Sequence, residues 1–339
     1  MSGWHFKKKL GFALLILVMS LTGCSSSSSG NNNGAYTEEN MNHFESEKKA
    51  IPDITSVDIS CSYADIEVIA SDGFYLEYSF YYVTEEPKLS TEDGMFFFDD
   101  TKMNQGSYSI SQKEQNYIKL YVPTTAKFEN FSLSTSSGDI SAGSFTTDKL
   151  SIEDDYGDVI LTSTMINDGT IKLSSGSLRV EEVGAKNLEL QNSYGDITLL
   201  NLNQGPYAKK DVKTSLNTTM SSGTFNGTNL SFHECHYVNS YGDVILNTVT
   251  ADTIHTVLRS GDLVANDIKA HNMNIENSYG DVSMIVKGTE KDYNLNAYSN
   301  YGTVTIGSRK YEGNVMIDHQ AEKDIEIKVS SGDISLNYK

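Results

Sequence analysis

The chain has 339 residues, and its 26 Lys and Arg against 45 Asp and Glu give a formal net charge of −19 at pH 7. A carboxylate excess of this size repels phosphate backbones, so nucleic acid is not an expected partner. Only three cysteines occur, without CxxC spacing, which excludes a disulfide framework. We expect Cys61 and Cys235 to be small buried side chains, with a disulfide between them as the less favoured alternative.

The first residues have the features of an export signal. Lys7, Lys8 and Lys9 precede an apolar run over 10–19, and Leu21-Thr22-Gly23-Cys24 follows. This order resembles a bacterial lipoprotein signal peptide with its lipobox. The apolar run is shorter than the about 20 residues of a membrane-spanning helix, which disfavours a permanent transmembrane anchor. We therefore predict a signal peptide over 1–23, a lipid on Cys24 as the new N-terminus, and a flexible tether over 24–49.

A short motif recurs through the rest of the chain. We call the tetrad Ser/Tyr-Gly-Asp-Val/Ile, with its close variants, the glycine mark. Its glycines are Gly138, Gly157, Gly176, Gly195, Gly223, Gly242, Gly261, Gly280, Gly302 and Gly332. Most intervals are 19 residues, and the longer ones of 28, 22 and 30 equal 19 plus inserts of 9, 3 and 11. One structural unit, which we call a rung, is therefore being stacked.

Apolar residues flank each glycine mark in pairs. They lie two and four residues after the glycine, as at Val159 and Leu161, and usually seven and five residues before it, as at Leu150 and Ile152. Each pair predicts a strand with one face in a core. The two pairs are an odd number of residues apart, so a straight strand would turn one pair outward. The glycine must therefore bend the chain to keep both pairs in the core. The sequence predicts an all-β fold, a β-solenoid (parallel β-helix-like) with rungs of about 19 residues.

The residue before the glycine alternates between Ser and Tyr. The order is Ser137, Tyr156, Ser175, Tyr194, Ser222, Tyr241, Ser260 and Tyr279, after which Tyr301 breaks it and Ser331 resumes it. This indicates a double unit of two rungs. We interpret the alternation as a way to keep bulky rings from meeting at adjacent rungs.

The segments outside the regular repeats have separate assignments. Residues 50–130 are β-rich but irregular, and we predict an N-terminal cap or first rungs there, with Ala64 in the place of a mark glycine. The regular solenoid is expected over 131–339. Within it, the insert around Gly205-Pro206 and the insert from Arg309 to Gln320 are expected to be loops that leave the stack.

Three features together resemble a known family. They are the run Ser56–Asp72, the segment Ile118–Pro123, and Ser136-Ser137-Gly138-Asp139-Ile140 followed by repeated Gly-Asp marks. In this order they are similar to a bacterial putative-adhesin family of β-strand-repeat proteins, a domain of unknown function. The resemblance covers about residues 50–339. It implies a β-helix-like fold on envelope-associated proteins, some of them near envelope-stress systems, and no catalytic residues.

Two columns of side chains are candidates for binding. The tyrosines Tyr156, Tyr194, Tyr241 and Tyr279 would line one edge at every second rung, where exposed rings can stack on sugars or on a partner's aromatic side chains. Rings folded over the corner to shield the glycine backbone are the structural alternative, which we favour. The mark carboxylates are Asp139, Asp158, Asp196, Asp243, Asp262, Asp281 and Asp333. A calcium ladder there is less favoured than hydrogen bonds from the carboxylates to nearby backbone amides.

Catalysis and metal binding have little support. The segment His233-Glu234-Cys235-His236 carries metal-type residues, but a strand would place His233 and Cys235 on one face and Glu234 and His236 on the other. Two soft ligands are too few for a closed zinc site. We predict a strand with a buried cysteine. A glycan-active β-helix enzyme needs two or three converging carboxylates, whereas the mark carboxylates are evenly spread. No cofactor is predicted.

The sequence therefore predicts a lipid-anchored, extracytoplasmic protein that acts as a non-enzymatic adhesion or interaction surface. Its expected partners are the membrane, through the lipid, and cell-wall glycan or another envelope protein. A structural or sensory accessory of the envelope-stress response, bound to a membrane protein of the same cell, is the alternative. An adhesion surface would bind cell-wall glycan or another envelope protein, whereas the accessory would bind a membrane protein of its own cell.

Overall fold

The computed structural model describes residues 42–83, 85–100, 115–209 and 211–339. The predicted signal peptide, Cys24 and most of the tether lie outside these residues. Within them the chain forms β-strands and two short 3₁₀ helices, Gly205–Tyr207 and Glu290–Asp292, without an α-helix. None of the described segments is a helix long and apolar enough to cross a membrane. The all-β prediction is confirmed.

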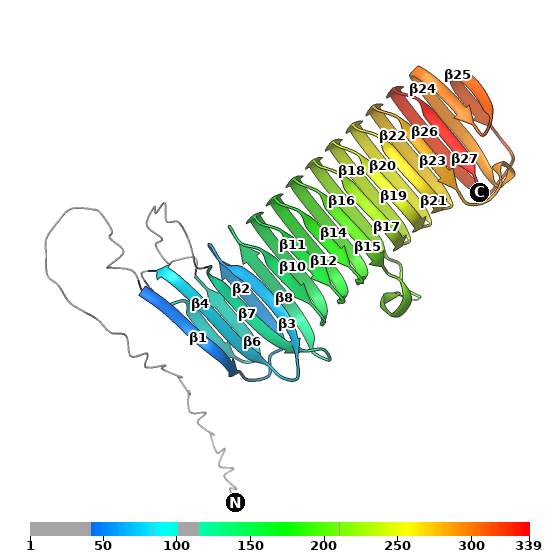
Figure 1. The fold of residues 1–339 in the computed structure, drawn as a ribbon. Helices are drawn as coiled ribbons and strands as arrows, with labels where there is room; N and C mark the ends of the chain where they lie inside the picture. The colour runs from blue at the N-terminus through cyan, green and yellow to red at the C-terminus, as the bar shows by residue number, and fades with distance from the viewer. Residues whose placement is uncertain (1–41, 84, 101–114, 210) are drawn as a thin grey trace, which may run out of the picture. The chain divides into compact units, whose positions relative to one another are not determined.

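Each rung contributes two strands, one on either side of the glycine mark (Figure 1). The strands before the marks form one parallel ladder, which we call the first ladder. In spatial order its members are β6 (Met95–Asp99), β2 (Ser56–Cys61), β8 (Lys127–Thr135), β10 (Thr146–Tyr156), β12 (Met165–Ser175), β14 (Gly184–Tyr194), β16 (Ser215–Ser222), β18 (Glu234–Tyr241), β20 (Thr253–Ser260), β22 (Asn272–Tyr279), β26 (Lys323–Ser331) and the first half of β24 (Tyr293–Ile306).

The strands after the marks form the second ladder in the same spatial order. Its members are β7 (Tyr117–Pro123), β3 (Asp65–Ser71), β9 (Ile140–Gly143), β11 (Val159–Thr162), β13 (Leu178–Glu181), β15 (Ile197–Leu202), β17 (Phe225–Ser231), β19 (Val244–Thr250), β21 (Leu263–Lys269), β23 (Val282–Val286), β27 (Ile334–Tyr338) and the second half of β24. The apolar pairs on both sides of the marks point inward and make one continuous core. The predicted solenoid is confirmed.

The glycines make the corner between the ladders possible. At Gly195 the backbone has φ +134°, and an added Cβ would lie 2.0 Å from the carbonyl oxygen of Gly176 in the neighbouring rung. Both the conformation and the close approach therefore exclude a side chain. The second corner, six residues after the glycine, also has positive φ but is built from other residues: Ser144, Ser163, Glu182, Asn201, Asn229, Thr248 and Asp267.

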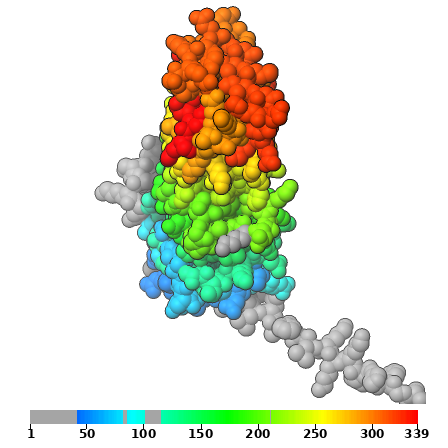
Figure 2. All heavy atoms as spheres, turned by 90° about the vertical axis from the view of Figure 1, so that its right-hand side faces the viewer, coloured from blue at the N-terminus to red at the C-terminus, as the bar shows by residue number. Residues whose placement is uncertain are grey.

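The order of rungs along the stack departs from the order in sequence at both ends. At the N-terminal end, β2 and β3 lie inside β6 and β7, which follow them in the chain. At the C-terminal end, β26 and β27 insert between β22/β23 and β24. In Figure 2 the red atoms of the last residues accordingly lie below the orange atoms of β24 and β25. The last segment of the chain thus has a hydrogen-bonded neighbour on each side.

Antiparallel strands cap both ends of the stack. At one end β4 (Tyr75–Val83) pairs with β7, β1 (Asn42–Ala50) pairs with β4, and β5 (Lys88–Glu92) pairs with β6. At the other end β25 (Arg309–Ile317) pairs with β24. Exposed strand edges invite association, and charged residues on β1 and β25 oppose it.

Two predictions about these segments need correction. Residues 42–49 belong to strand β1 and not to the tether, and their charged sequence gave no apolar alternation from which to recognise a strand. The insert 309–320 is mainly the capping strand β25 and not a loop. The insert around Gly205 is confirmed as an excursion with one 3₁₀ turn.

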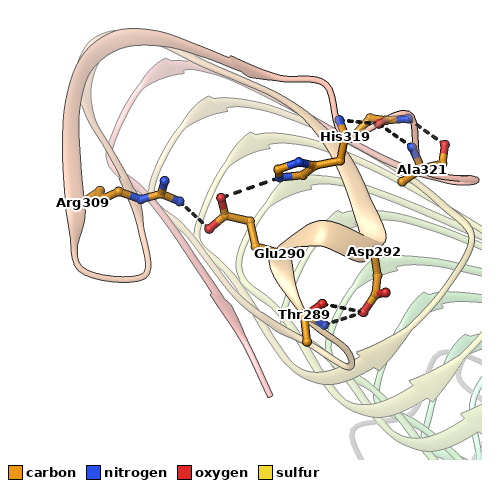
Figure 3. Close-up of polar contacts among 7 residues, drawn as sticks. Thr289, Glu290, Asp292, Arg309, His319 and Ala321 are labelled. Atoms are coloured by element: carbon orange, nitrogen blue, oxygen red, sulfur yellow. Dashed lines mark hydrogen bonds and ion pairs between the residues drawn. The ribbon is translucent and has the colours of Figure 1, made fainter.

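Polar contacts fasten the C-terminal cap (Figure 3). Glu290, from the 3₁₀ helix before β24, accepts a hydrogen bond from the Arg309 guanidinium of β25, and its other oxygen lies 3.8 Å from His319 Nε2. The Asp292 carboxylate accepts hydrogen bonds from the backbone N–H and the hydroxyl of Thr289, at 2.6 and 2.9 Å, and the first of these holds the pKa of Asp292 below its usual range. The backbone N–H of Ala321 donates to Asn294 Oδ1 at 3.0 Å. These contacts hold the chain where it turns back into the stack.

We predict that Gly195→Ala lowers the free energy of unfolding by about 3 kcal/mol or more, because the added methyl group must displace the backbone of the preceding rung. The control is Gly205→Ala, at φ +52° with no atom within 4 Å of the added Cβ. It should cost only about 1 kcal/mol. Urea unfolding followed by circular dichroism measures both, and equal costs would contradict the close-approach argument.

Candidate functional site

An exposed column of tyrosines follows the corner of the stack. Tyr156, Tyr194, Tyr241 and Tyr279 are 64–68% exposed, so most of each side chain faces solvent. This contradicts the alternative that we favoured from the sequence, in which the rings fold over the corner. The mark serines lie between them in the ladder, as in the consecutive partners Tyr194, Ser222 and Tyr241.

The alternation of Ser and Tyr before the mark glycines, which breaks at Tyr301 in the sequence, is continuous along the stack. Because β26 inserts between β22 and β24, Ser331 pairs with Tyr279 on one side and with Tyr301 on the other. Tyr301 is 75% exposed and therefore extends the column. At the other end the pairing of Cys61 with Thr135 places Tyr63, 53% exposed, beside Ser137. We call the six residues Tyr63, Tyr156, Tyr194, Tyr241, Tyr279 and Tyr301 the tyrosine column.

The mark carboxylates act as connectors between rungs. Oδ1 of Asp243 accepts a hydrogen bond from the backbone N–H of Asp262 at 2.8 Å, and Oδ1 of Asp262 accepts one from Asp281 at 2.8 Å. The same bond recurs from Asp158 to Asp139 and from Asp333 to Asp281. This is the backbone-amide role that we favoured over a calcium ladder.

The carboxylate ladder is interrupted by neutral residues. Ser177, Thr224 and Thr303 occupy its position in three rungs, and each still donates a backbone N–H to the aspartate of a neighbouring rung. Across the described ranges, no cluster of three or more His, Cys, Asp or Glu side chains has the arrangement of a metal site. Calcium binding by the mark carboxylates stays an untested alternative.

A second alternation lies beneath the tyrosine column and was missed in the sequence. Three residues before the glycine, every tyrosine-type rung from β14 to β22 has a buried asparagine: Asn192, Asn239 and Asn277. Their Nδ2 atoms donate to the carbonyl oxygens of Gly176, Gly223 and Gly261 in the preceding rung at 2.8, 2.8 and 2.9 Å. The corner carbonyl needs a donor because it is withdrawn from water. A regular Asn-x-Tyr-Gly pattern is the signal that could have revealed it.

Asp154 takes the place of the asparagine in its rung. The side chain is 2% exposed, and among the described residues neither oxygen has a partner in hydrogen-bonding geometry. Burial raises the pKa of Asp154 to about 7, and the carboxylates of Asp139, Asp155 and Asp158 add to this rise. The backbone N–H of Tyr156 is near enough to offset part of the rise but does not meet hydrogen-bonding geometry. The protonated acid can donate its O–H where asparagine donates N–H, but the carboxylate cannot.

The segment around Cys235 is structural. Strand β18 begins at Glu234, Cys235 is fully buried, and burial raises the pKa of its thiol to about 12. The backbone N–H of Thr214 donates to His233 Nδ1 at 3.0 Å, which ties the turn before β18 to the previous rung. Cys61 and Cys235 are both free and buried, as predicted.

A hollow of ≈ 520 Å³ opens along the first ladder between Asn130 of β8 and Asn217 of β16. Its acidic residues already have amide partners. Asn187 Nδ2 donates to Asp168 Oδ1 at 2.6 Å, and Gln191 Nε2 donates to Glu189 Oε1 at 2.7 Å. The hollow lies on the strands and not on the corner that carries the tyrosine column.

Comparison with known proteins places the chain in a family. The sequence profile of Toastrack DUF4097 matches residues 54–226 and 204–337, so the chain belongs to this family of β-repeat proteins of unknown function. Among curated proteins no match was found.

Solved structures that align with most of this chain have low sequence identity to it. One is a putative adhesin from Parabacteroides distasonis, with 12% identity, a TM-score of 0.40, and coverage of 88% of this chain and 97% of that one. Another is a putative adhesin from Bacteroides fragilis, with 14% identity, a TM-score of 0.32, and coverage of 88% and 96%. A third, from P. distasonis, is described as a putative lipid binding protein, with 12% identity, a TM-score of 0.27, and coverage of 88% and 97%.

We predict that Asp154→Asn stabilises the protein above neutral pH by about 1–3 kcal/mol, because the amide supplies the missing donor. The folded-state pKa is about 7, above the ordinary 3.8, so the folded chain holds this proton more tightly than the unfolded chain. Stability due to Asp154 is therefore present at low pH and is lost as pH rises from about 4 to above 7.

The stabilisation by Asp154→Asn should accordingly shrink at about pH 5. Asn192→Asp is the matched reverse change and should destabilise more at about pH 8.5 than at about pH 5. Thermal unfolding of the three proteins at both pH values measures these effects. A gain from Asp154→Asn that is the same at both pH values would show that the carboxyl group does not titrate in this range.

Proposed function

We propose that this protein is a lipid-anchored, extracytoplasmic interaction protein without catalytic activity, and that it binds its partner with the tyrosine column. The observation that carries the proposal is the row of exposed rings at every second rung. Tyrosine presents a large amphipathic surface with few rotatable bonds, which suits it to recognition. The backbone ladders on both sides of the corner fix the spacing of the tyrosine Cα positions, so only the side chains need to be ordered on binding.

Anchoring is supported by the N-terminal sequence. The lysines at 7–9, the apolar run and Leu21-Thr22-Gly23-Cys24 have the order of a lipoprotein signal. Acyl chains on Cys24 would hold the repeat domain at the membrane face outside the cytoplasm, with the chain between Cys24 and β1 as the spacer.

The anchoring proposal predicts that Cys24→Ala prevents lipid attachment. In a bacterial host fed radiolabelled palmitate, the native chain should incorporate label and sediment with membranes, whereas the variant should carry no label. Lys9→Gln is the control, since it leaves two lysines before the apolar run and keeps Cys24. Equal labelling of native and Cys24→Ala chains would rule out this attachment site.

The binding proposal predicts that a variant with Tyr156, Tyr194, Tyr241 and Tyr279 changed to Ser loses most of its saturable binding to isolated cell walls. The native comparison is the same domain, residues 38–339, assayed by sedimentation with the walls. The matched control changes four exposed residues away from the column, Met95, Ile160, Val238 and Met316, to Ser.

Circular dichroism must show both variants folded. Retained wall binding by the tyrosine variant would contradict the proposal. If the native domain itself shows no wall binding and instead cross-links to a membrane protein of its own cell, the sensory or structural role in the envelope takes its place.

A further inference from the structure

The tyrosine column has a constant period. Each pair of neighbouring tyrosines is separated by one serine rung, as the partners Tyr156, Ser175 and Tyr194 show. Parallel strands lie about 4.8 Å apart, so successive rings are separated by about 9.6 Å along the stack. The insertion of Ser331 between Tyr279 and Tyr301 keeps this period to the end of the column. A ligand that contacts several rings must itself repeat at about this length.

Extended β-1,4-linked glycans have such a repeat. Successive sugars along these chains are turned over, so the same ring face returns once per disaccharide, and the length of the disaccharide is close to two strand spacings. The apolar C–H face of a sugar can pack on an exposed aromatic ring. By contrast, α-1,4-linked glycans coil and do not return one face along a straight line.

Carboxylates next to the corner residues can accept hydrogen bonds from sugar hydroxyls. For five of the six column tyrosines an aspartate lies two residues further along the chain, across the corner residue; after Tyr301 that position is Thr303. Oδ1 of Asp196, for example, accepts the backbone N–H of Thr224, and within the described part of the chain no hydrogen bond uses its Oδ2. Such an oxygen can accept a hydrogen bond from a hydroxyl donor. The same carboxylates, with the net charge of −19, repel acidic polymers.

We infer that the tyrosine column binds one extended, uncharged β-1,4-linked glycan strand, with one tyrosine per disaccharide. This inference rests on the proposed binding role of the column and adds the ligand class and its register. The small serine rungs leave room for the intervening sugar, whose opposite face is turned to the protein.

Calorimetric titration with β-1,4-linked N-acetylglucosamine oligomers of two to eight sugars tests the inference. Affinity should rise roughly 5-fold with each added disaccharide, which corresponds to about 1 kcal/mol per stacked ring. Malto-oligosaccharides, with α-1,4 links, and polygalacturonate, which is acidic, should bind at least about 10-fold more weakly than the octamer, a difference of about 1.4 kcal/mol.

A variant that moves one ring without changing the number of rings, which we call the phase variant, tests whether binding depends on the spacing of the tyrosines. Tyr194→Ser combined with Ser175→Tyr keeps the number of rings but moves one ring by a single rung. It should bind the octamer as weakly as Tyr194→Ser alone. Full affinity of the phase variant, or equal affinity for the α-linked oligomers, would overturn the inference of register.

Cell-wall binding tests the binding role of the tyrosine column, and the glycan titrations test its ligand. If cell-wall binding depends on the four tyrosines but the titrations show no preference for β-1,4 links and no growth with chain length, the column binds another wall component and only the ligand assignment is wrong. If the four-tyrosine variant binds walls as the native domain does, the binding role of the column is wrong as well.

Discussion

The close approach of glycine backbones at the first corner is the constraint on which the rest of the structure depends. The Cα of each mark glycine faces a corner carbonyl oxygen of the neighbouring rung, that of Ala64 for Gly138 and that of a glycine for the others, at a separation that leaves no space for a methyl group. This contact fixes how the two ladders meet and brings the inward residues of both strands into one core. It also withdraws the corner carbonyl from water, which creates the need for an internal donor. The buried asparagines and the inter-rung bonds of the mark carboxylates are responses to this geometry.

The same corner explains why the tyrosines are displayed. A side chain just before the glycine lies where the backbone turns, and the rung on each side offers only a serine. The rings at neighbouring tyrosine rungs are therefore separated, and they stay in solvent instead of packing on one another. Inside the corner, the polar asparagine of the tyrosine rung alternates with Leu173, Met220 or Leu258 of the serine rung. The alternation of tyrosine and serine outside the corner and that of asparagine and apolar residues inside it thus belong to one double unit of two rungs.

Much of the fold could be predicted because its determinants are local and repeated. The glycine spacing and the apolar pairs gave the rung, the strands and the first corner, and the excess of Asp and Glu was evident from composition. The sequence has no recurring glycine at the second corner, because residues such as Thr248 and Asp267 adopt its left-handed conformation instead, so this corner was not predicted. The exchange of rung order at the ends was also hidden, since it depends on long-range pairing. Its one trace was Tyr301, which broke the alternation in sequence and restores it in space. The exposure of the rings depends on the corner geometry and so could not be read from the motif.

The central claim is that the tyrosine column is the surface that meets the partner. The direct measurement is ¹⁹F NMR of protein carrying fluorotyrosine at one site, Tyr241 or Tyr237, during titration with solubilised cell-wall fragments. Both residues lie on β18, but Tyr241 is 64% exposed and Tyr237 is 1% exposed. The account predicts a saturable shift of the Tyr241 signal and an unchanged Tyr237 signal. An unchanged Tyr241 signal at fragment concentrations that saturate binding would contradict it.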